Sequence, residues 1–209
     1  AGRLFGVGVP HTSPAEQSTV RAKGRRLTLY VPVATAIPAD APVYLSSFAR
    51  AEAGLARRLA QLAGTEPAAD AGRVERWIER YEAAAGMELA PEQRQALRLG
   101  ASSGLFVLTG GPGTGKTTTL RALYRLLVTM GRTVVLAAPT GKAARRLTEV
   151  TGAPASTVHR LLGAGREGRD FAHDEDNPLP FDVVVVDESS MLDLFLAYSL
   201  VRAVRPGAQ

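Results

Sequence analysis

Residues 110–117 of the chain, GGPGTGKT, have the pattern of a phosphate-binding loop. Its glycines let successive backbone N–H groups converge on phosphate oxygens with no Cβ in the way, and the helix that follows would direct its N-terminal donors at the same charge. Lys116 would neutralise the β- and γ-phosphates, and the hydroxyl of Thr117 would bind Mg²⁺. The pattern predicts a nucleoside triphosphate site with ATP and Mg²⁺ as ligands; the alternative is a glycine-rich turn that binds nothing. The residues expected to contact the nucleotide here are Gly111, Pro112, Gly113, Thr114, Gly115, Lys116, Thr117 and Thr118.

Two adjacent carboxylates, Asp187 and Glu188, follow four consecutive valines at residues 183–186. Such a run predicts a strand buried on both faces, and its carboxyl end is where open α/β sheets bind ligands. Asp187 would orient Mg²⁺ through its waters, and Glu188 would be the general base for the water that attacks the γ-phosphate. With Lys116 they form the predicted catalytic set. The alternative is a pair of solvated charges that cap the next helix.

Lysine is rare in this chain, supplying three of the 25 basic residues, at Lys23, Lys116 and Lys142. Lys116 and Lys142 each follow a glycine directly. Since the chain otherwise uses arginine, a compact ammonium at these places indicates a requirement for a small point charge. For Lys142, chance remains the alternative.

The composition narrows the classes of protein that the chain can represent. Its 209 residues are 45% hydrophobic, enough for one sizeable domain, or one domain with a smaller attachment. The lack of cysteine excludes disulfides, thiolate metal sites and cysteine nucleophiles. No segment approaches the roughly 18 apolar residues of a membrane span, so we expect a cytoplasmic protein without a membrane partner. A net charge of +5 suits a polyanionic partner, but such a surplus is also common in proteins that bind none.

The first part of the chain is expected to form a small accessory unit. Alternating apolar residues from Leu27 to Val33 predict a strand, and Pro32 within it favours the edge of a sheet. Apolar positions spaced three and four residues apart then predict a helix over residues 47–63. Small residues and Pro67 favour a boundary within residues 64–72. The expected division is an accessory unit at residues 1–66 and a larger domain at residues 67–209.

The rest of the chain has the order of elements of an α/β protein. Helical spacing of apolar residues predicts two helices, Pro91 and Glu92 suit the first turn of another, and short apolar runs without that spacing predict strands. The expected elements are helices at residues 72–85, 91–99 and 116–130, strands at 105–109, 133–138 and 183–186, and a loop at 163–180. A strand, a helix and a second strand in this order predict the parallel crossover of a doubly wound sheet.

Five segments, taken in order, resemble the opening motifs of the RecD/TraA-like superfamily 1 DNA helicases. They are residues 89–93, 109–119, 138–147, 156–162 and 186–191, and the resemblance covers about residues 74–194. It implies a RecA-like P-loop NTPase fold and 5′-to-3′ movement on single-stranded DNA, driven by ATP. The implied partners are single-stranded DNA, junctions of single- and double-stranded DNA, and a second RecA-like domain of the same protein. Such a protein would be associated with the nucleoid.

By the same resemblance, Gln93 contacts the adenine, whose edge a carboxamide can read by both donating and accepting. The alternative is an ordinary polar helix residue. Ala90 stands where the family often has a Ser or Thr helix cap.

The resemblance also implies two DNA-contact segments. They contain Pro139, Thr140, Gly141 and Lys142, and Thr157 and His159. Each segment would follow a strand and open a helix, where N–H groups and hydroxyls can bind phosphates. Without the resemblance, Thr140 would be a helix cap, the arginines after Lys142 a solvated face, and His159 a structural residue.

In such helicases a glutamine that senses the γ-phosphate, and arginines from the second RecA-like domain, complete the catalytic site. The chain has no counterpart of these motifs before Gln209. We therefore expect a piece of a longer helicase with little ATP turnover of its own. Its sheet would lack the strand that lies, in such helicases, between the strands expected here at residues 105–109 and 183–186. Two rival functions remain open: a P-loop kinase of small molecules, and an ATP-dependent DNA clamp or recombination mediator that does not unwind DNA.

Overall fold

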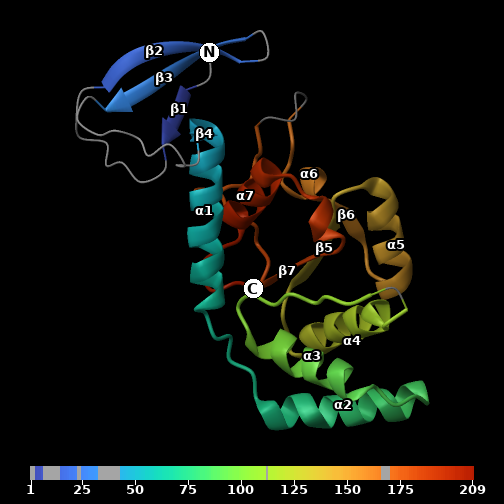
Figure 1. Cartoon of the computed structure of the whole chain (residues 1–209). Helices are drawn as coiled ribbons and strands as arrows, with labels where there is room; N and C mark the ends of the chain where they lie inside the picture. Colours follow the sequence, from blue (N-terminus) through green and yellow to red (C-terminus); the bar gives the residue numbers. More distant parts are fainter. Residues whose placement is uncertain (1–2, 7–14, 23–24, 33–42, 112, 166–169) are drawn as a thin grey trace. The chain divides into compact units, whose positions relative to one another are not determined.

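The computed structural model describes residues 3–6, 15–22, 25–32, 43–111, 113–165 and 170–209 of the chain (Figure 1). The chain divides into two compact units, Ala1–Gly54 and Leu55–Gln209. The division falls within the first helix, α1 (Ser46–Ala63). No helix in the described part of the chain is long and apolar enough to cross a membrane.

The N-terminal unit contains a four-stranded sheet in the order β2-β3-β1-β4. The strands are β1 (Arg3–Gly6), β2 (Ala15–Ala22), β3 (Arg25–Pro32) and β4 (Val43–Leu45). The predicted strand is β3, but its expected place at the edge is wrong, because β3 lies between β2 and β1. Pro32 is tolerated since it is the last residue of β3, beyond Thr28 and Leu29 where β1 pairs. Val33 lies outside the described residues.

Two helices, α2 and α3, follow α1 in the larger unit. α2 (Ala71–Ala85) starts at Asp70, whose carboxylate accepts a hydrogen bond from the backbone N–H of Arg73 at 2.9 Å, and stops at the left-handed Gly86. α3 (Pro91–Ser102) begins with proline, which fits the first turn because its missing N–H would have no partner there. The helices predicted at residues 47–63, 72–85 and 91–99 are therefore confirmed, with α3 three residues longer.

A three-stranded parallel sheet in the order β6-β5-β7 forms the middle of this unit. Helices connect its strands, so the predicted α/β fold of the P-loop NTPase class is confirmed. The elements are α4 (Lys116–Thr129), β5 (Val134–Ala138), α5 (Gly141–Thr151), β6 (Ala155–Thr157), α6 (Val158–Leu161), β7 (Val183–Val186), the 3-10 helix η1 (Ser189–Met191) and α7 (Leu194–Ala203).

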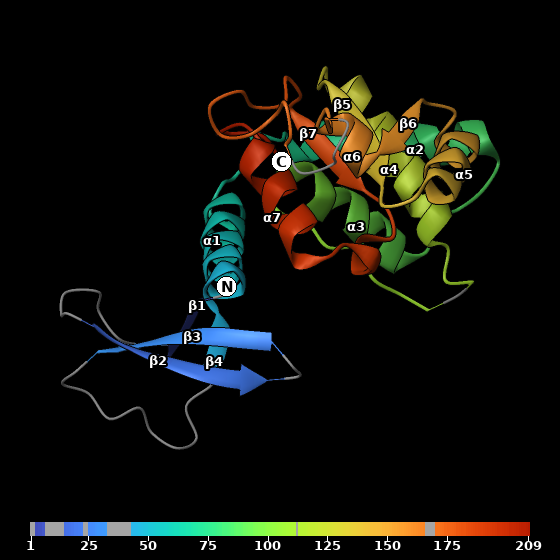
Figure 2. The same ribbon diagram turned by 90° about the horizontal axis from the view of Figure 1, so that it is seen from above.

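Helices cover both faces of this sheet, as Figure 1 shows. Val183 packs with α2, α3 and α4 on one face, whereas Ala137 packs with α6 and α7 on the other. Successive residues of a strand point to opposite faces, which is why an unbroken apolar run is needed in both β5 and β7. α5 packs through Leu147 against Leu136 and lies at the end of the unit opposite to α7 (Figure 2).

The strand predicted at residues 105–109 does not form, and this prediction is wrong. Leu105 and Phe106 are partly buried against the core, but 73% of Val107 is exposed. An apolar run becomes a strand only where a neighbouring backbone pairs with it. The edge of β7 away from β5 instead pairs with Gln209, whose carbonyl accepts from Val184 N at 2.8 Å and whose N–H donates to the Asp182 carbonyl at 2.9 Å.

Candidate nucleotide and DNA site

The phosphate-binding loop ends at the first residue of α4, as its sequence requires. Gly113 and Gly115 have φ angles of +76° and +79°, which L-residues with a side chain rarely adopt. At Gly110 an added Cβ would lie 2.7 Å from Thr114 Oγ1, so this position is also restricted to glycine. Pro112 lies outside the described residues. Gly115 provides no side-chain cap for α4, and the first-turn N–H groups are left for a ligand.

The side chain of Lys116 reaches back across the loop to its first two residues. Its Nζ donates to the carbonyls of Gly110 and Gly111, the latter at 2.7 Å, while Thr114 Oγ1 donates to the Gly111 carbonyl at 2.8 Å. Phosphate oxygens are stronger partners for an ammonium than neutral carbonyls are. A bound triphosphate would therefore draw the ammonium of Lys116 away from these carbonyls and onto its own oxygens. Thr117 is exposed and Thr118 is partly buried on the first turn of α4.

Gln93 lies directly beside the loop, as the resemblance implies. Its Oε1 accepts from the backbone N–H of Ala90 at 2.9 Å, and its Nε2 approaches the Gly115 carbonyl at 3.5 Å, a long hydrogen bond. The side chain of Ala90 has no acceptor for the N–H of Gln93, so of the two hydrogen bonds of a capping box only the one from Ala90 N to Gln93 Oε1 is present. Oε1 retains a second lone pair and Nε2 a second N–H. One edge of an adenine base could use both.

Asp187 and Glu188 follow β7 at the carboxyl edge of the sheet. Asp187 N donates to the Ala137 carbonyl at 3.0 Å, which continues the pairing with β5, and Asp187 Oδ1 accepts from Glu188 N at 3.0 Å. Glu188 is exposed and has φ +53° and ψ 38°; it is the only residue other than glycine with a positive φ in the described part of the chain. Such a conformation costs on the order of 1 kcal/mol and is typical of functional sites.

Parallel pairing brings the predicted site residues to one edge of the sheet. Ala138 pairs with Thr157, and Ala137 pairs with Val186, so Pro139, Thr157 and Asp187 all lie where their strands end. α4 precedes β5 and runs back to its beginning, which puts the loop at this same edge.

The oxygen donors at this edge suit Mg²⁺. The hydroxyl of Thr117 and the carboxylate of Asp187 are the hard ligands that this ion prefers. In the described residues no group of three or more His, Cys, Asp or Glu side chains could hold a metal ion. The arrangement fits an ion that is held jointly by one or two protein oxygens, water and the nucleotide phosphates.

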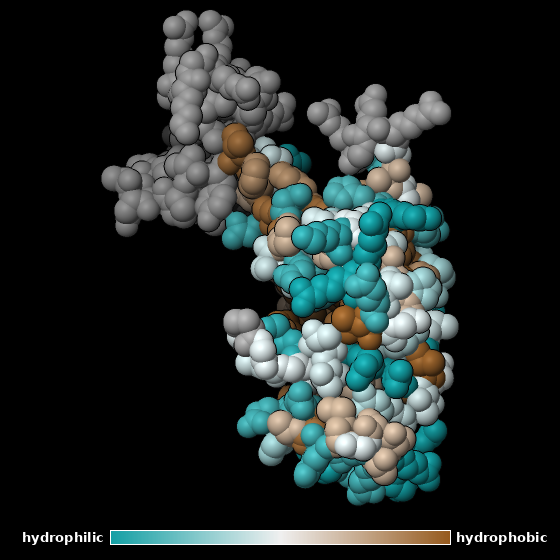
Figure 3. Space-filling view, turned by 90° about the vertical axis from the view of Figure 1, so that its right-hand side faces the viewer, coloured by the Kyte–Doolittle hydropathy of each residue, from teal (hydrophilic) through white to brown (hydrophobic). Residues whose placement is uncertain are grey.

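The two segments expected to contact DNA both begin helices with a threonine cap. Thr140 Oγ1 accepts from Ala143 N, and Thr157 Oγ1 accepts from Arg160 N, each at 3.2 Å. The capping interpretation of Thr140 is therefore confirmed, and the DNA contact stays a prediction. Gly141, Lys142 and His159 are exposed, whereas Pro139 is partly buried. The face that carries α5 is mostly hydrophilic (Figure 3).

Two residues that the sequence did not single out, Glu82 and Arg94, join α2 to α3 beside Gln93. Glu82 Oε1 accepts from Arg94 Nε at 3.0 Å and from Leu89 N at 2.8 Å. These hydrogen bonds, that of Arg94 foremost, hold the pKa of Glu82 below its usual range, and the same pairing raises the pKa of Arg94. They are twelve residues apart on different helices, so no local spacing rule could have found them.

The chain matches the model of the AAA domain family over residues 93–209, which include the loop and both carboxylates. It is 49% identical over 167 residues to the ATP-dependent RecD2 DNA helicase of Deinococcus radiodurans, covering 80% of this chain and 23% of that protein. It is 45% identical to the RecBCD enzyme subunit RecD of Mycobacterium tuberculosis, with coverage of 56% and 24%. The chain spans about a quarter of the length of these relatives. It therefore belongs to the AAA domain family, and the RecD-like resemblance of its motifs is confirmed.

Proposed function

We propose that the chain supplies the nucleotide-binding half of the motor of an ATP-dependent DNA helicase, which couples ATP hydrolysis to 5′-to-3′ translocation on single-stranded DNA. One observation carries the proposal: the uncapped N-terminus of α4, with Lys116 across its loop, lies at the same sheet edge as Asp187 and Glu188. In this proposal residues 67–209 form the first RecA-like domain, and residues 1–66 form an accessory unit.

The phosphates of ATP would bind to the N–H groups of the loop and of the first turn of α4. Lys116 would move from the two glycine carbonyls to the β- and γ-phosphate oxygens and neutralise their charge. Thr117 and Asp187 would hold Mg²⁺, which lowers the charge repulsion at the γ-phosphate when it is bound. Glu188, exposed beside them, would accept the proton of the attacking water. Gln93 would read the adenine.

The remaining transition-state contacts would come from other parts of the protein. In this proposal a γ-phosphate-sensing glutamine and the arginines of a second RecA-like domain complete the site. Arginines supplied in this way are worth about 10³–10⁵ in turnover among P-loop NTPases. The names of two relatives, an ATP-dependent RecD2 DNA helicase and a RecBCD enzyme subunit RecD, support a protein that acts on DNA.

The DNA strand would cross the same edge of the sheet beside α5 and α6. Thr140 and Thr157 fix the first turns of these helices, and Lys142 and His159 are exposed next to them. Contacts to phosphates and sugars position a strand without reading its sequence, as a translocating motor requires. Junctions of single- and double-stranded DNA would bind at the same place.

The test is ATP hydrolysis by the full-length protein with and without single-stranded DNA, combined with unwinding of duplexes that carry a 5′ or a 3′ overhang. The proposal expects stimulation by DNA and unwinding only from the 5′ overhang. Glu188→Gln should bind ATP with unchanged affinity but hydrolyse it about 10²–10³-fold more slowly, because the general base is lost. ATP turnover without DNA stimulation would favour a kinase, and stimulation without strand separation would favour a DNA clamp or mediator.

A further inference from the structure

The carboxylate of Glu82 holds the chain on both sides of Gln93. Its Oε1 accepts hydrogen bonds from Leu89 N at 2.8 Å and from Arg94 Nε at 3.0 Å, and its Oε2 pairs with Nη2 of the same arginine. Only 11% of the Glu82 side chain is exposed. Leu89 lies four residues before Gln93, and Arg94 directly follows it. One side chain of α2 therefore fixes both ends of the short segment that presents the Gln93 amide.

The main chain of Glu82 contributes to the same junction. Its carbonyl accepts from the N–H of Gly86, which closes α2, and from Met87 N at 3.2 Å. Leu89, two residues further on, is almost fully buried. α3 then begins at Pro91, and Ala90, which precedes it, has no side-chain acceptor to stabilise the first turn. The entry into α3 is thus held by the preceding helix.

Charge makes glutamate the fitting residue for this task. The Arg94 guanidinium and the Leu89 N–H keep the pKa of Glu82 below its usual range, so the carboxylate stays ionised near neutral pH. An ionised carboxylate offers two equivalent oxygens to the planar fork of arginine and still accepts a backbone N–H. A glutamine could keep the bond from Leu89 N but would lose the paired geometry with Arg94.

The Gln93 amide has little freedom once its backbone is fixed. Its Oε1 is bonded to Ala90 N at 2.9 Å, and its Nε2 lies so close to the loop that a Cβ on Gly115 would approach it to 2.4 Å. Small displacements of a positioning group cost about 10²-fold where the chemistry depends on alignment. The position of the segment from Leu89 to Arg94 therefore decides where this amide meets a base.

We propose that Glu82 is a positioning residue for recognition of the adenine base: through Leu89 and Arg94 it sets the place of the Gln93 amide, and selectivity for ATP over other nucleoside triphosphates depends on it although it does not touch the nucleotide. The inference rests on the proposed binding of ATP at the loop. It adds to that function a residue on α2, outside the segment that matches the AAA domain family.

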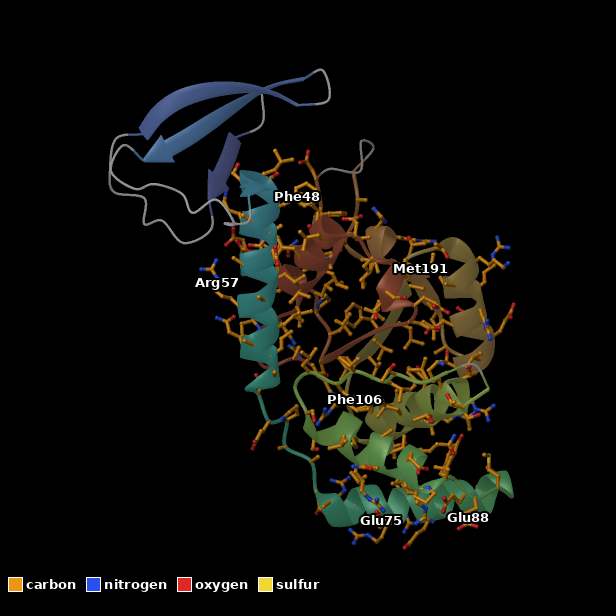
Figure 4. All side chains as sticks on the ribbon, in the orientation of Figure 1. Phe48, Arg57, Glu75, Glu88, Phe106 and Met191 are labelled. Carbon is orange, nitrogen blue, oxygen red and sulfur yellow. The ribbon has the colours of Figure 1, made fainter. Side chains whose placement is uncertain are left out.

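The chain offers a matched control on the same two helices. Arg98 of α3 pairs with Glu75 of α2 at 2.8 Å, one turn further along and away from Gln93. Glu75 lies along α2, near the lower edge of Figure 4. Arg98→Ala removes an ion pair between α2 and α3 just as Glu82→Ala does, but leaves Leu89 and Arg94 hydrogen-bonded to Glu82 and keeps the 3.5 Å pair of Arg94 with Glu75.

The experiment measures KM and kcat of the full-length protein for ATP and for GTP, together with direct binding of fluorescent ATP and GTP analogues. Glu82→Ala should raise KM for ATP about tenfold and leave kcat at saturation and KM for GTP within about twofold. Gln93→Ala should produce the same shift, and the double variant no more than either, because both act through one contact. Arg98→Ala should lower the melting temperature and leave both KM values unchanged.

The proposal is overturned if Glu82→Ala raises KM for ATP and GTP equally, if Arg98→Ala does the same, or if the effects of Glu82→Ala and Gln93→Ala add. If Glu82→Ala fails to fold, Glu82→Gln replaces it, with a rise in KM for ATP of about threefold expected and none for GTP. A wild-type protein that binds ATP and GTP equally would overturn this inference alone. A wild-type protein that binds no nucleotide would overturn the proposed function and this inference with it.

Discussion

The helices of the larger unit begin in two different ways. α2, α5, α6 and α7 start from a residue whose side chain accepts a hydrogen bond from the first turn. Those residues are Asp70, Thr140, Thr157 and Asp193. α4 instead starts from Gly115, which has no side chain. Since the first N–H groups of any helix need an acceptor from outside the helix, α4, like α3 after Ala90, depends on water or on a ligand for what α2, α5, α6 and α7 obtain from a capping side chain.

This difference separates the nucleotide site from the expected DNA contacts, although both lie at helix N-termini. A triphosphate would complete α4, so ATP should stabilise the folded protein strongly by mass action. The first turns of α5 and α6 are already ordered by Thr140 and Thr157 before DNA binds. DNA should therefore stabilise the folded protein less than ATP does.

The largest effect is expected at Lys116. Lys116→Ala should lower ATP turnover by about 10³-fold, because the charge facing the developing negative charge of the γ-phosphate is lost. Affinity for single-stranded DNA should stay within about twofold of wild type. Lys142→Ala is the control, since it follows a glycine at the capped helix α5, and should leave ATP turnover measured without DNA intact. ATP hydrolysis that survives Lys116→Ala would contradict the assignment of the loop.

Gly115 provides the next test, because the uncapped start of α4 depends on it. Gly115→Ala places a Cβ 2.4 Å from Gln93 Nε2 at a φ of +79°. It should destabilise the fold by roughly 1–2 kcal/mol and weaken ATP binding at least about tenfold. Gly131→Ala is the control, because Gly131 has a φ of +82° but no atom lies within 4 Å of an added Cβ. It should destabilise the fold and leave ATP binding unchanged. Denaturant unfolding and nucleotide titration separate the two, and equal ATP affinities would contradict the role of Gly115.

A capped helix should respond differently. Thr140→Ala should destabilise the protein by about 1 kcal/mol, because the N–H of Ala143 loses its acceptor, whereas Thr140→Ser should stay within a few tenths. ATP affinity should be unchanged in both. Unfolding in urea measures the first effect, and a loss of ATP binding in Thr140→Ala would show that α5 and the phosphate loop are not independent.

The smallest effect concerns the carboxylate cap of α2. The N–H of Arg73 holds the pKa of Asp70 below its usual range, with further help from the N–H of Gly72 and the charge of Arg76. A carboxyl whose pKa is lower in the folded than in the unfolded state stabilises the fold above its unfolded pKa, about 4, and that contribution disappears as the pH falls through the folded value. The melting temperatures of Asp70→Asn and wild type should therefore differ slightly at pH 7, and the difference should shrink as the pH falls below about 4.

Helices and the phosphate loop could be predicted because their signals are local. Val74, Ile78 and Tyr81 repeat with the helical period and are buried in the core as that period requires. Leu105 and its neighbours were mistaken for a strand because a short apolar run has no period that distinguishes a strand from a buried irregular segment. Only the pairing of the neighbouring backbone decides between them, and the edge of β7 pairs with Gln209 instead.

The site was predictable only in part for the same reason. The loop and the pair Asp187–Glu188 are contiguous in sequence, and parallel pairing brings them to one edge as expected. The expected role of Gln93 came from resemblance alone, and its contact with Gly115, 22 residues away, was not predicted. Glu82 and Arg94 belong to different helices, so their partnership depends on how α2 packs on α3 and has no trace in the spacing of either.

At position 188 the left-handed backbone favours one type of residue and the proposed chemistry favours another. In a regular strand, adjacent side chains point to opposite faces, and the turn at φ +53° ends that alternation directly after Asp187. Glycine or asparagine would hold this turn at lower free energy, whereas the proposed chemistry requires a carboxylate. In the proposed function, selection for thermal resistance and selection for turnover would thus favour different residues at position 188, and a substitution that relaxes this turn would slow ATP hydrolysis.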